Sequence, residues 1–127
     1  MSLTEATTTE RLRAYLTEVA ARGVPVTYAE AARAIGLEPP FTIHQITEAI
    51  EQLMAEDAAA GRPFIAALVI SKARRGLPAA GFFDCAKRLR RFDGDPAGPD
   101  ARAFHGREFS AAVAFWKTAS TKDCGSV

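Results

Sequence analysis

Residues 24–36 read VPVTYAEAARAIG, and this stretch decides how the rest of the chain is interpreted. Thr27 and Glu30 have the spacing of a capping box, in which a hydroxyl and a carboxylate bind the free backbone N–H groups at a helix start. The box predicts a short helix over 28–35, and its alanines permit close approach to a neighbouring helix. The Val-Pro-Val before Thr27 indicates a very short strand.

Helically spaced apolar residues predict a longer helix on each side of this stretch. The first runs over 9–22 and ends before Gly23, which suits the left-handed conformation that closes many helices. The second runs over 42–60 and is opened by a second capping box, made by Thr42 and Gln45. Its expected core stripe is Ile43, Ile46, Ile50, Leu53 and Met54.

Beyond residue 60 the pattern changes from helical to mixed. Residues 64–71 (FIAALVIS) form a continuous apolar run with β-branched residues, which predicts a buried strand. A basic loop punctuated by Gly and Pro follows over 72–81. A short helix is expected over 82–89 and a last helix over 101–118, capped by Asp100. The expected core stripe of the last helix is His105, Phe109, Ala112, Val113 and Trp116.

This order of elements predicts a mainly α fold with a small β component: a winged helix-turn-helix core plus two C-terminal helices. The short and long helices would form the helix-turn-helix, and the strand with the basic loop would form the wing. A generic α+β domain is the structural alternative. We expect a single domain over 9–118, between a flexible N-terminus (1–8) and a disordered tail (119–127).

Composition indicates one small globular domain: 127 residues, 48% hydrophobic and 24% charged, with a net charge of +1. Cys85 and Cys124 have no CxxC or Cys/His pattern around them, so we expect no disulfide and no metal site. The chain starts without a signal-peptide pattern, and its longest apolar run, 64–70, is too short to span a bilayer. These features predict a cytoplasmic protein without a cofactor and without a membrane partner.

Residues 24–36 resemble the start of the helix-turn-helix in the alkylguanine-DNA alkyltransferase family, where a V-P-Y-G-E-V-A-like stretch opens the short helix. That family's reactive Pro-Cys-His-Arg motif is absent here, and neither histidine follows a cysteine. The resemblance therefore implies a fold and gives no support for alkyl transfer.

A broader resemblance spans roughly residues 24–116. Within it, 67–83 (ALVISKARRGLPAAGFF) resembles a recurring segment of small bacterial proteins of uncharacterised function. In those proteins a strand leads into a Gly-Leu-Pro turn and a Gly-Phe-Phe helix start. This resemblance implies no assigned activity and no catalytic residues.

The stretch 72–91 is strongly cationic, with seven basic residues against one acidic residue. On a wing and an adjacent helix, these charges would suit binding to phosphates, as in double-stranded DNA. A solvated face that keeps a small protein in solution accounts for the same pattern, and the two interpretations stay open. The candidate phosphate-binding residues are Lys72, Arg74, Arg75, Lys87, Arg88, Arg90 and Arg91.

The predicted long helix is acidic, because five carboxylates and no Lys or Arg lie between residues 38 and 57. If it is the recognition helix, its face opposes the DNA backbone, and only His44 and Gln45 remain as candidate base readers. An acidic face also suits docking to a charged protein, or head-to-tail self-association. The candidate protein-contact residues are Glu48, Glu51, Glu56 and Phe115.

The sequence favours a binding protein over an enzyme. His44 and His105 have no Ser, Cys or carboxylate at a spacing that marks a nucleophile or a metal site. The glycines of 76–81 lack the spacing of a phosphate-binding loop. Two functions remain open: a nucleic-acid-binding or regulatory protein that contacts phosphates through a basic wing, and a protein-interaction module, adaptor or inhibitor, with no nucleic-acid role.

Overall fold

The computed structural model describes residues 7–96 and 98–125, with side chains described as far as Lys117. Within these residues the α-helices are α1 (Thr8–Arg22), α2 (Tyr28–Ala34), α3 (Thr42–Ala60), α4 (Ala80–Arg88) and α5 (Pro99–Gly125). The short elements are β1 (Val26–Thr27), β2 (Val69–Ile70) and two 3-10 turns, η1 (Ile65–Leu68) and η2 (Lys72–Arg74). The chain is thus mainly helical with a very small β component, as predicted.

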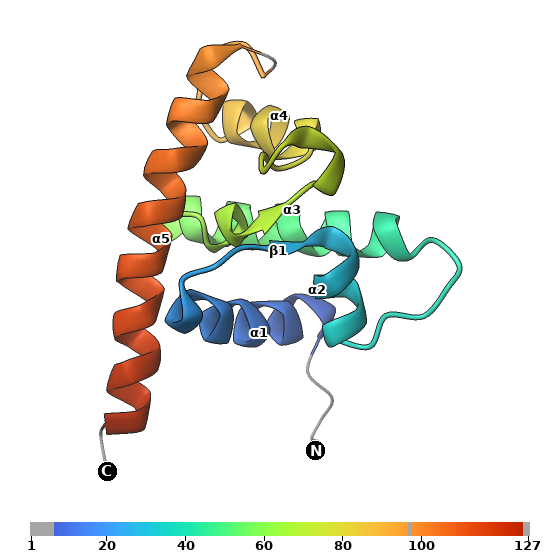
Figure 1. Ribbon diagram of the computed structural model, residues 1–127, viewed down its shortest axis with the longest axis vertical. Coiled ribbons are helices and arrows are strands. Elements are labelled where there is room, and N and C mark those ends of the chain that lie inside the picture. The colour runs from blue at the N-terminus through green and yellow to red at the C-terminus, as the bar shows by residue number, and fades with distance from the viewer. Residues whose placement is uncertain (1–6, 97, 126–127) are drawn as a thin grey trace.

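Helix α3 lies between α1 and α4, and α5 crosses the ends of α1 and α3 on one side of the molecule (Figure 1). The turn η1 is buried in the middle of this arrangement, where it contacts α1, α3 and α5. Apolar side chains of all these elements form one core, since the stripes of α1 and α3 meet the aromatic side chains of α4 and α5. Each fully buried side chain of Leu or Phe size stabilises the fold by roughly 1.5–3 kcal/mol.

The predicted start of α2 is confirmed. The backbone N–H of Glu30 donates to Thr27 Oγ1 at 3.1 Å, and the N–H of Thr27 donates to Glu30 Oε1 at 2.9 Å. The left-handed helix ends are also as expected, with Gly23 at φ 73° after α1 and Gly61 at φ 71° after α3. A capping box that we did not predict, between Thr7 and Glu10, opens α1.

The predicted capping box at the start of α3 is wrong. Thr42 lies inside the helix, and Phe41, which precedes it with φ 64°, provides no side-chain cap. The side chain of Gln45 instead folds back and donates to the carbonyls of Glu38 and Pro40, both at 3.1 Å. The amide thus stabilises the loop before α3.

The strand predicted over residues 64–71 is only two residues long. Its partner β1 is equally short, because Pro25 precedes it without an N–H donor and helix α2 begins directly after Thr27. Two side chains bind backbone N–H groups earlier in the run: Asp57 accepts from Ile65 at 3.1 Å, and Glu108 accepts from Phe64 at 3.0 Å. The apolar run is therefore buried as a 3-10 turn that leads into a short parallel pair.

The expected wing is not a two-stranded hairpin: among the described residues, β2 pairs only with β1, and in parallel. The basic loop instead turns back on itself, with the N–H of Ser71 donating to the carbonyl of Leu77 at 2.8 Å. The N–H of Ala79 donates to the hydroxyl of Tyr28 at 2.9 Å, which ties the loop to α2. The loop is a compact turn of fixed position.

A buried ion cluster joins α1, α3 and α5. Asp57 lies on the core side of α3, fully buried, with Oδ1 at 2.9 Å from Arg13 Nη1 and at 3.0 Å from Arg62 Nη2. Both guanidinium groups lie over the ring of Trp116, at 5.0 and 5.3 Å from its centroid. Asp57 is therefore not part of the acidic outer face on which the sequence pattern placed it.

The ends of the chain differ in part from expectation. Helix α5 begins one residue before Asp100, the predicted cap, and continues to Gly125, through most of the segment 119–127 that was expected to be disordered. Of the N-terminus that was expected to be flexible (1–8), residues 1–6 lie outside the described residues, whereas Thr7 caps α1 and Thr8 begins it. Over the described part of the chain, no helix combines the length and the apolar character needed to cross a membrane.

Candidate functional site

An open groove of about 960 Å³ lies between the start of α1, the outer side of α3 and the end of α4. Helical spacing explains its composition, because Gln45, Glu48 and Gln52 share the side of α3 opposite to the core residues Ile46 and Ile50. The charged residues that line the groove are Glu10, Glu48, Glu51, Glu56 and Arg88. Four carboxylates against one guanidinium make this groove acidic.

The four carboxylates differ in the hydrogen bonds and ion pairs that they form within the protein. Glu10 caps α1, and Glu56 accepts from Arg13 Nη2 at 3.0 Å, which, partly offset by desolvation, lowers the pKa of the Glu56 carboxyl. Glu51 lies 3.4 Å from Arg88 Nη2.

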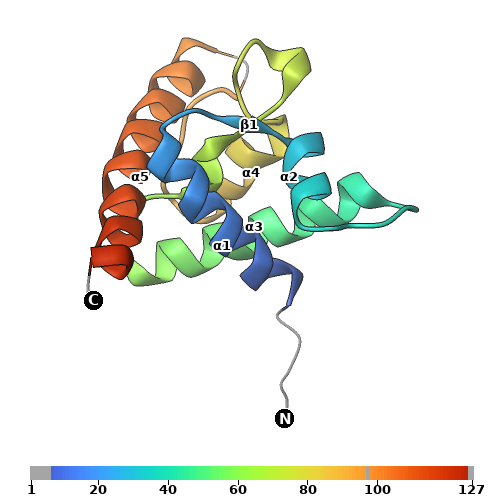
Figure 2. The ribbon, with the colours of Figure 1, turned by 60° about the horizontal axis from the view of Figure 1, so that its bottom comes forward.

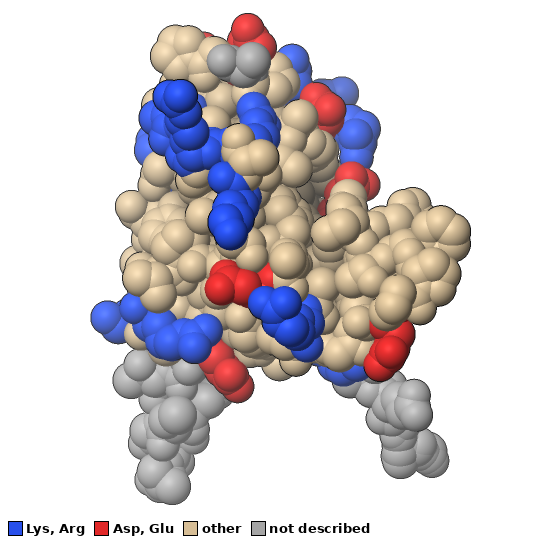
Figure 3. Space-filling view, turned by 45° about the vertical axis from the view of Figure 1, so that its right-hand side comes forward, with Lys and Arg blue, Asp and Glu red and all other residues tan. Residues whose placement is uncertain are grey.

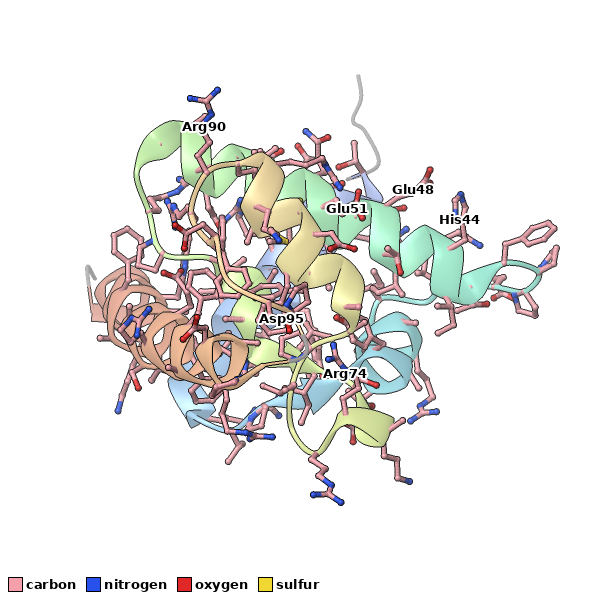
Figure 4. The ribbon with its side chains drawn as sticks, turned by 90° about the horizontal axis from the view of Figure 1, so that it is seen from above. His44, Glu48, Glu51, Arg74, Arg90 and Asp95 are labelled. Atoms are coloured by element: carbon pink, nitrogen blue, oxygen red, sulfur yellow. The ribbon has the colours of Figure 1, made fainter. Side chains whose placement is uncertain are left out.

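Among the described residues, the carboxylate of Glu48 forms an ion pair with His44 alone, at 3.2 Å, and both of these side chains are mostly exposed. Figure 4 shows His44, Glu48 and Glu51 following one another along α3. Glu48 is therefore the carboxylate with the weakest contact to the rest of the protein, and Glu51, with its longer contact to Arg88, is held more loosely than Glu56. The predicted protein-contact residues Glu48, Glu51 and Glu56 do lie together in one groove.

One wall of the groove contains the buried thiol of Cys85, which is free, as the sequence predicted. Burial raises the pKa of this thiol, and the nearby carboxylate of Glu51 raises it further. A protonated thiol is a poor nucleophile. The groove thus has the chemistry of a binding surface, with carboxylates that attract cations.

An apolar tip, formed by Phe41 and Ile43, lies at the start of α3. The side chain of Phe41 is 76% exposed and that of Ile43 is 59% exposed, so the prediction that Ile43 lies in the core is wrong. The reason is length: α3 and the loop before it extend past α1, α2 and α4, as Figures 1 and 2 show. In Figure 3 this end of the molecule is an uncharged lobe at the right edge.

The predicted phosphate-binding residues do not form one cluster. The guanidinium of Arg74 donates to the carbonyls of Pro78 and Pro96, and it lies 5.9 Å from the ring centroid of Phe83. Arg91 donates to the carbonyls of Asp57 and Arg62 and lies 4.4 Å from the ring centroid of Phe64. These two arginines are part of the scaffold.

The other predicted cations lie at different places. Arg88 belongs to the acidic groove. Lys72 and Arg75 lie exposed on the η2 loop, whereas Lys87 and Arg90 lie exposed at the far end of α4. Figure 4 shows this separation through its two labelled arginines, Arg74 and Arg90, which lie at opposite ends of α4.

The two predicted base readers and Phe115 have separate surroundings. The amide of Gln45 is bound to backbone carbonyls, and the ring of His44 pairs with Glu48. Phe115 is exposed, as expected, but its ring makes an edge-to-face contact with Trp116 of α5, with ring centroids 4.9 Å apart. It is not among the residues that line the acidic groove.

Sequence reasoning missed Glu10, Arg88 as a groove residue, and the apolar tip. The Thr-x-x-Glu pattern at residues 7–10 is a detectable signal for the first, because a capping box fixes where a helix begins. The exposure of Phe41 and Ile43 has no such signal, since helical periodicity does not show how far a core extends.

Over the described residues, no group of three or more His, Cys, Asp or Glu side chains is placed to hold a metal ion. Comparison of the chain with protein families, with curated proteins and with solved structures finds no match. The groove, the apolar tip and the charged surfaces are therefore the features from which a function can be inferred.

Proposed function

We propose that this protein is a protein-interaction module that binds a cationic segment of a partner protein in the acidic groove between α1, α3 and α4. The observation that carries this proposal is the charge of the groove, which is lined by four carboxylates and one guanidinium. A Lys or Arg side chain of the partner would bind Glu48 and compete with Arg88 for Glu51. Electrostatic complementarity of this kind accelerates association and selects partners of the opposite charge.

Charge alone gives a modest affinity, because an exposed ion pair contributes only about 0.2–1 kcal/mol. The apolar tip can add binding affinity that the charges alone do not provide. Exposed aromatic side chains at the edge of a groove are common anchors of protein interfaces, and Phe41 lies four residues before Gln45, which lines the groove. We therefore expect the partner segment to place an apolar residue next to its basic ones.

The order of α1, β1, α2 and α3 supports a helix-turn-helix type of core, and we propose that this chain uses such a core as a scaffold for protein contacts. A fold does not determine function, so the choice depends on the surface. The outer side of α3, which would face DNA in a helix-turn-helix protein, carries carboxylates that repel phosphate. The same carboxylates attract Lys and Arg.

The test is fluorescence anisotropy with a labelled amphipathic peptide of alternating Lys and Leu at helical spacing. The Glu48→Lys/Glu51→Lys variant should bind at least about ten-fold more weakly than the wild type, since two ion pairs become repulsive. The matched control is Glu18→Lys/Asp84→Lys, which makes the same charge change at exposed positions outside the groove. An equal loss in both variants, or no binding by the wild type at low salt, would overturn the proposal.

A further inference from the structure

A second charged surface lies where the η2 loop meets the start of α5 and the end of α2. Arg102 of α5 donates from Nη2 to the carbonyl of Arg75 at 3.5 Å, so these two residues are neighbours. Lys72 and Arg33 are close enough to act on the carboxyl of Glu30, whose pKa is lowered first by the N–H of Thr27 and further by these two cations. We call Arg33, Lys72, Arg75 and Arg102 the cation strip.

We infer that the cation strip binds the phosphate backbone of double-stranded DNA. This binding surface is separate from the acidic groove and does not depend on the protein-binding proposal. Figure 3 shows Lys and Arg side chains at several places on this face, with some Asp and Glu side chains between them. None of the four side chains forms an ion pair within 4.0 Å among the described residues, in contrast to Arg88 and Arg91. Glu30 offsets part of the charge of Arg33 and Lys72, and the remaining charge of the strip is available to a ligand.

The strip is held in place by the scaffold. Ser71 and Leu77 close the η2 loop, and the guanidinium of Arg74 binds the carbonyls of Pro78 and Pro96 from inside it. Arg74 therefore positions Lys72 and Arg75 and does not itself contact the ligand. Cations held in a fixed arrangement lose less conformational entropy on binding than those of a mobile loop.

The backbone of Arg75 has an unusual conformation. Its φ is 55°, in the left-handed region, and Gly76 follows directly. A long side chain at such a position costs stability that glycine would not cost. Arg90, at the end of α4, has the same kind of conformation, with φ 65°. The contact with Arg102, and not the backbone conformation, therefore distinguishes Arg75.

The chemistry of the strip favours duplex DNA over other polyanions. Single-stranded nucleic acid is bound largely by stacking of bases on exposed aromatic side chains. The exposed large apolar residues of the described chain are Val24, Phe41, Ile43 and Phe115, and none of them belongs to the strip. The nearby Tyr28 is partly buried, and its hydroxyl is bound by Ala79. Without stacking or membrane-inserting side chains, the strip offers charge alone, which suits the outside of a duplex.

The test is the binding of a labelled random-sequence DNA duplex to the full chain, measured by fluorescence anisotropy at increasing salt. Four phosphate contacts predict a log–log slope of roughly −3.6, which is about a 150-fold loss between about 50 and 200 mM salt. The Lys72→Glu/Arg75→Glu variant should bind at least about ten-fold more weakly and with a shallower slope. The helical circular dichroism of this variant should match that of the wild type.

The matched control is Lys87→Glu/Arg90→Glu, which reverses two exposed charges at the other end of α4. The exposed Arg107→Glu variant measures the general effect of a change in net charge on DNA affinity. Beyond that effect, the Lys87→Glu/Arg90→Glu control should change the affinity by less than about two-fold. An equal loss in the control would place the contact at the end of α4 and overturn the assignment. Absence of duplex binding at low salt, or tighter binding of a single strand of the same length, would also overturn it. Because Glu48→Lys/Glu51→Lys leaves the strip intact, this inference can fail or hold independently of the acidic groove.

Discussion

Arg13 Nη1 lies 2.9 Å from Oδ1 of the fully buried Asp57, yet the pair does not have hydrogen-bond geometry, so this contact is Coulombic. Arg62 donates a hydrogen bond to the same oxygen through Nε at 3.2 Å, and its Nη2 lies 3.0 Å from it. The second oxygen accepts from the N–H of Ile65. One carboxylate thus joins α1, the end of α3 and η1, and it sets the positions of the helices that form the acidic groove.

Replacement of Asp57 by Ala should lower the free energy of unfolding by about 3–5 kcal/mol, because two cations and one buried N–H lose their shared acceptor. Urea unfolding followed by circular dichroism measures this change. Asp84→Ala, on the exposed side of α4, is the control and should change the stability by less than about 0.5 kcal/mol. A loss below about 1 kcal/mol for Asp57→Ala would show that the ion cluster is not a major source of stability.

Stability should fall as the pH drops below about 6.5, because of His105. Its Nε2 lies 2.9 Å from the carbonyl of Ala67, which can only accept, so this nitrogen carries a proton. Burial lowers the pKa of the imidazole, while the Ala67 hydrogen bond partly offsets this. The unfolded chain therefore binds a proton near pH 6.5, whereas the folded chain binds it only at lower pH, so stability is complete above 6.5 and declines below it.

Urea unfolding at several pH values between about 5 and 7.5 tests this effect, with His105→Gln as the comparison. The variant should lose the decline over that range, although its stability at pH 7.5 is itself lower. Glu30 and Glu56 do not interfere, because groups with a lowered carboxyl pKa lose their contribution only below about 4.5. The same pH slope in both proteins would exclude His105 as the source.

Sequence patterns predicted most of the helices here because local rules determine them. The Thr27–Glu30 box, Gly23 and Gly61 each act within one helical turn, and each is found where it was expected. The strand predicted over residues 64–71 was largely wrong, because a run of apolar residues indicates burial and does not by itself distinguish a strand from a turn.

The sequence also could not show that the basic residues of 72–91 lie at different places on the molecule. The positions of basic residues along the chain do not show which guanidinium groups bind backbone carbonyls of the protein itself, as those of Arg74 and Arg91 do. Asp57 did leave a signal, since a carboxylate four residues after Leu53 falls on the core stripe of α3 and therefore requires a buried partner. Its partners come from α1 and from the loop after α3, which no local pattern links.

Phe41→Gly should raise stability and weaken partner binding at the same time. A bulky residue at φ 64° costs about 1–2 kcal/mol, whereas glycine at this position costs only about 0.5–1 kcal/mol of chain entropy. Because most of the Phe41 ring is exposed, little packing is lost, so we expect a net gain of up to about 1 kcal/mol. Thermal unfolding and the peptide anisotropy assay measure the two effects. A lower melting temperature would mean that the ring stabilises the fold.

Tyr28→Phe should loosen the η2 loop without disturbing the core. The hydroxyl of Tyr28 accepts the N–H of Ala79, and its burial raises the pKa of the phenol, so it stays protonated at neutral pH. Its removal leaves the Ala79 N–H without this acceptor and should lower the free energy of unfolding by about 1–2 kcal/mol. Amide hydrogen exchange should accelerate over residues 72–79 while the amides of η1 keep their protection.

The same variant relates the loop to DNA binding. If a fixed arrangement of Lys72 and Arg75 contributes to affinity, Tyr28→Phe should weaken duplex binding by a few-fold while keeping the salt slope, because no charge has been removed. Tyr15→Phe, which removes the hydroxyl of a partly buried tyrosine on α1, is the matched control and should leave both measurements unchanged. Faster exchange of the loop with unchanged DNA affinity would show that the cations bind phosphate from a flexible loop just as well.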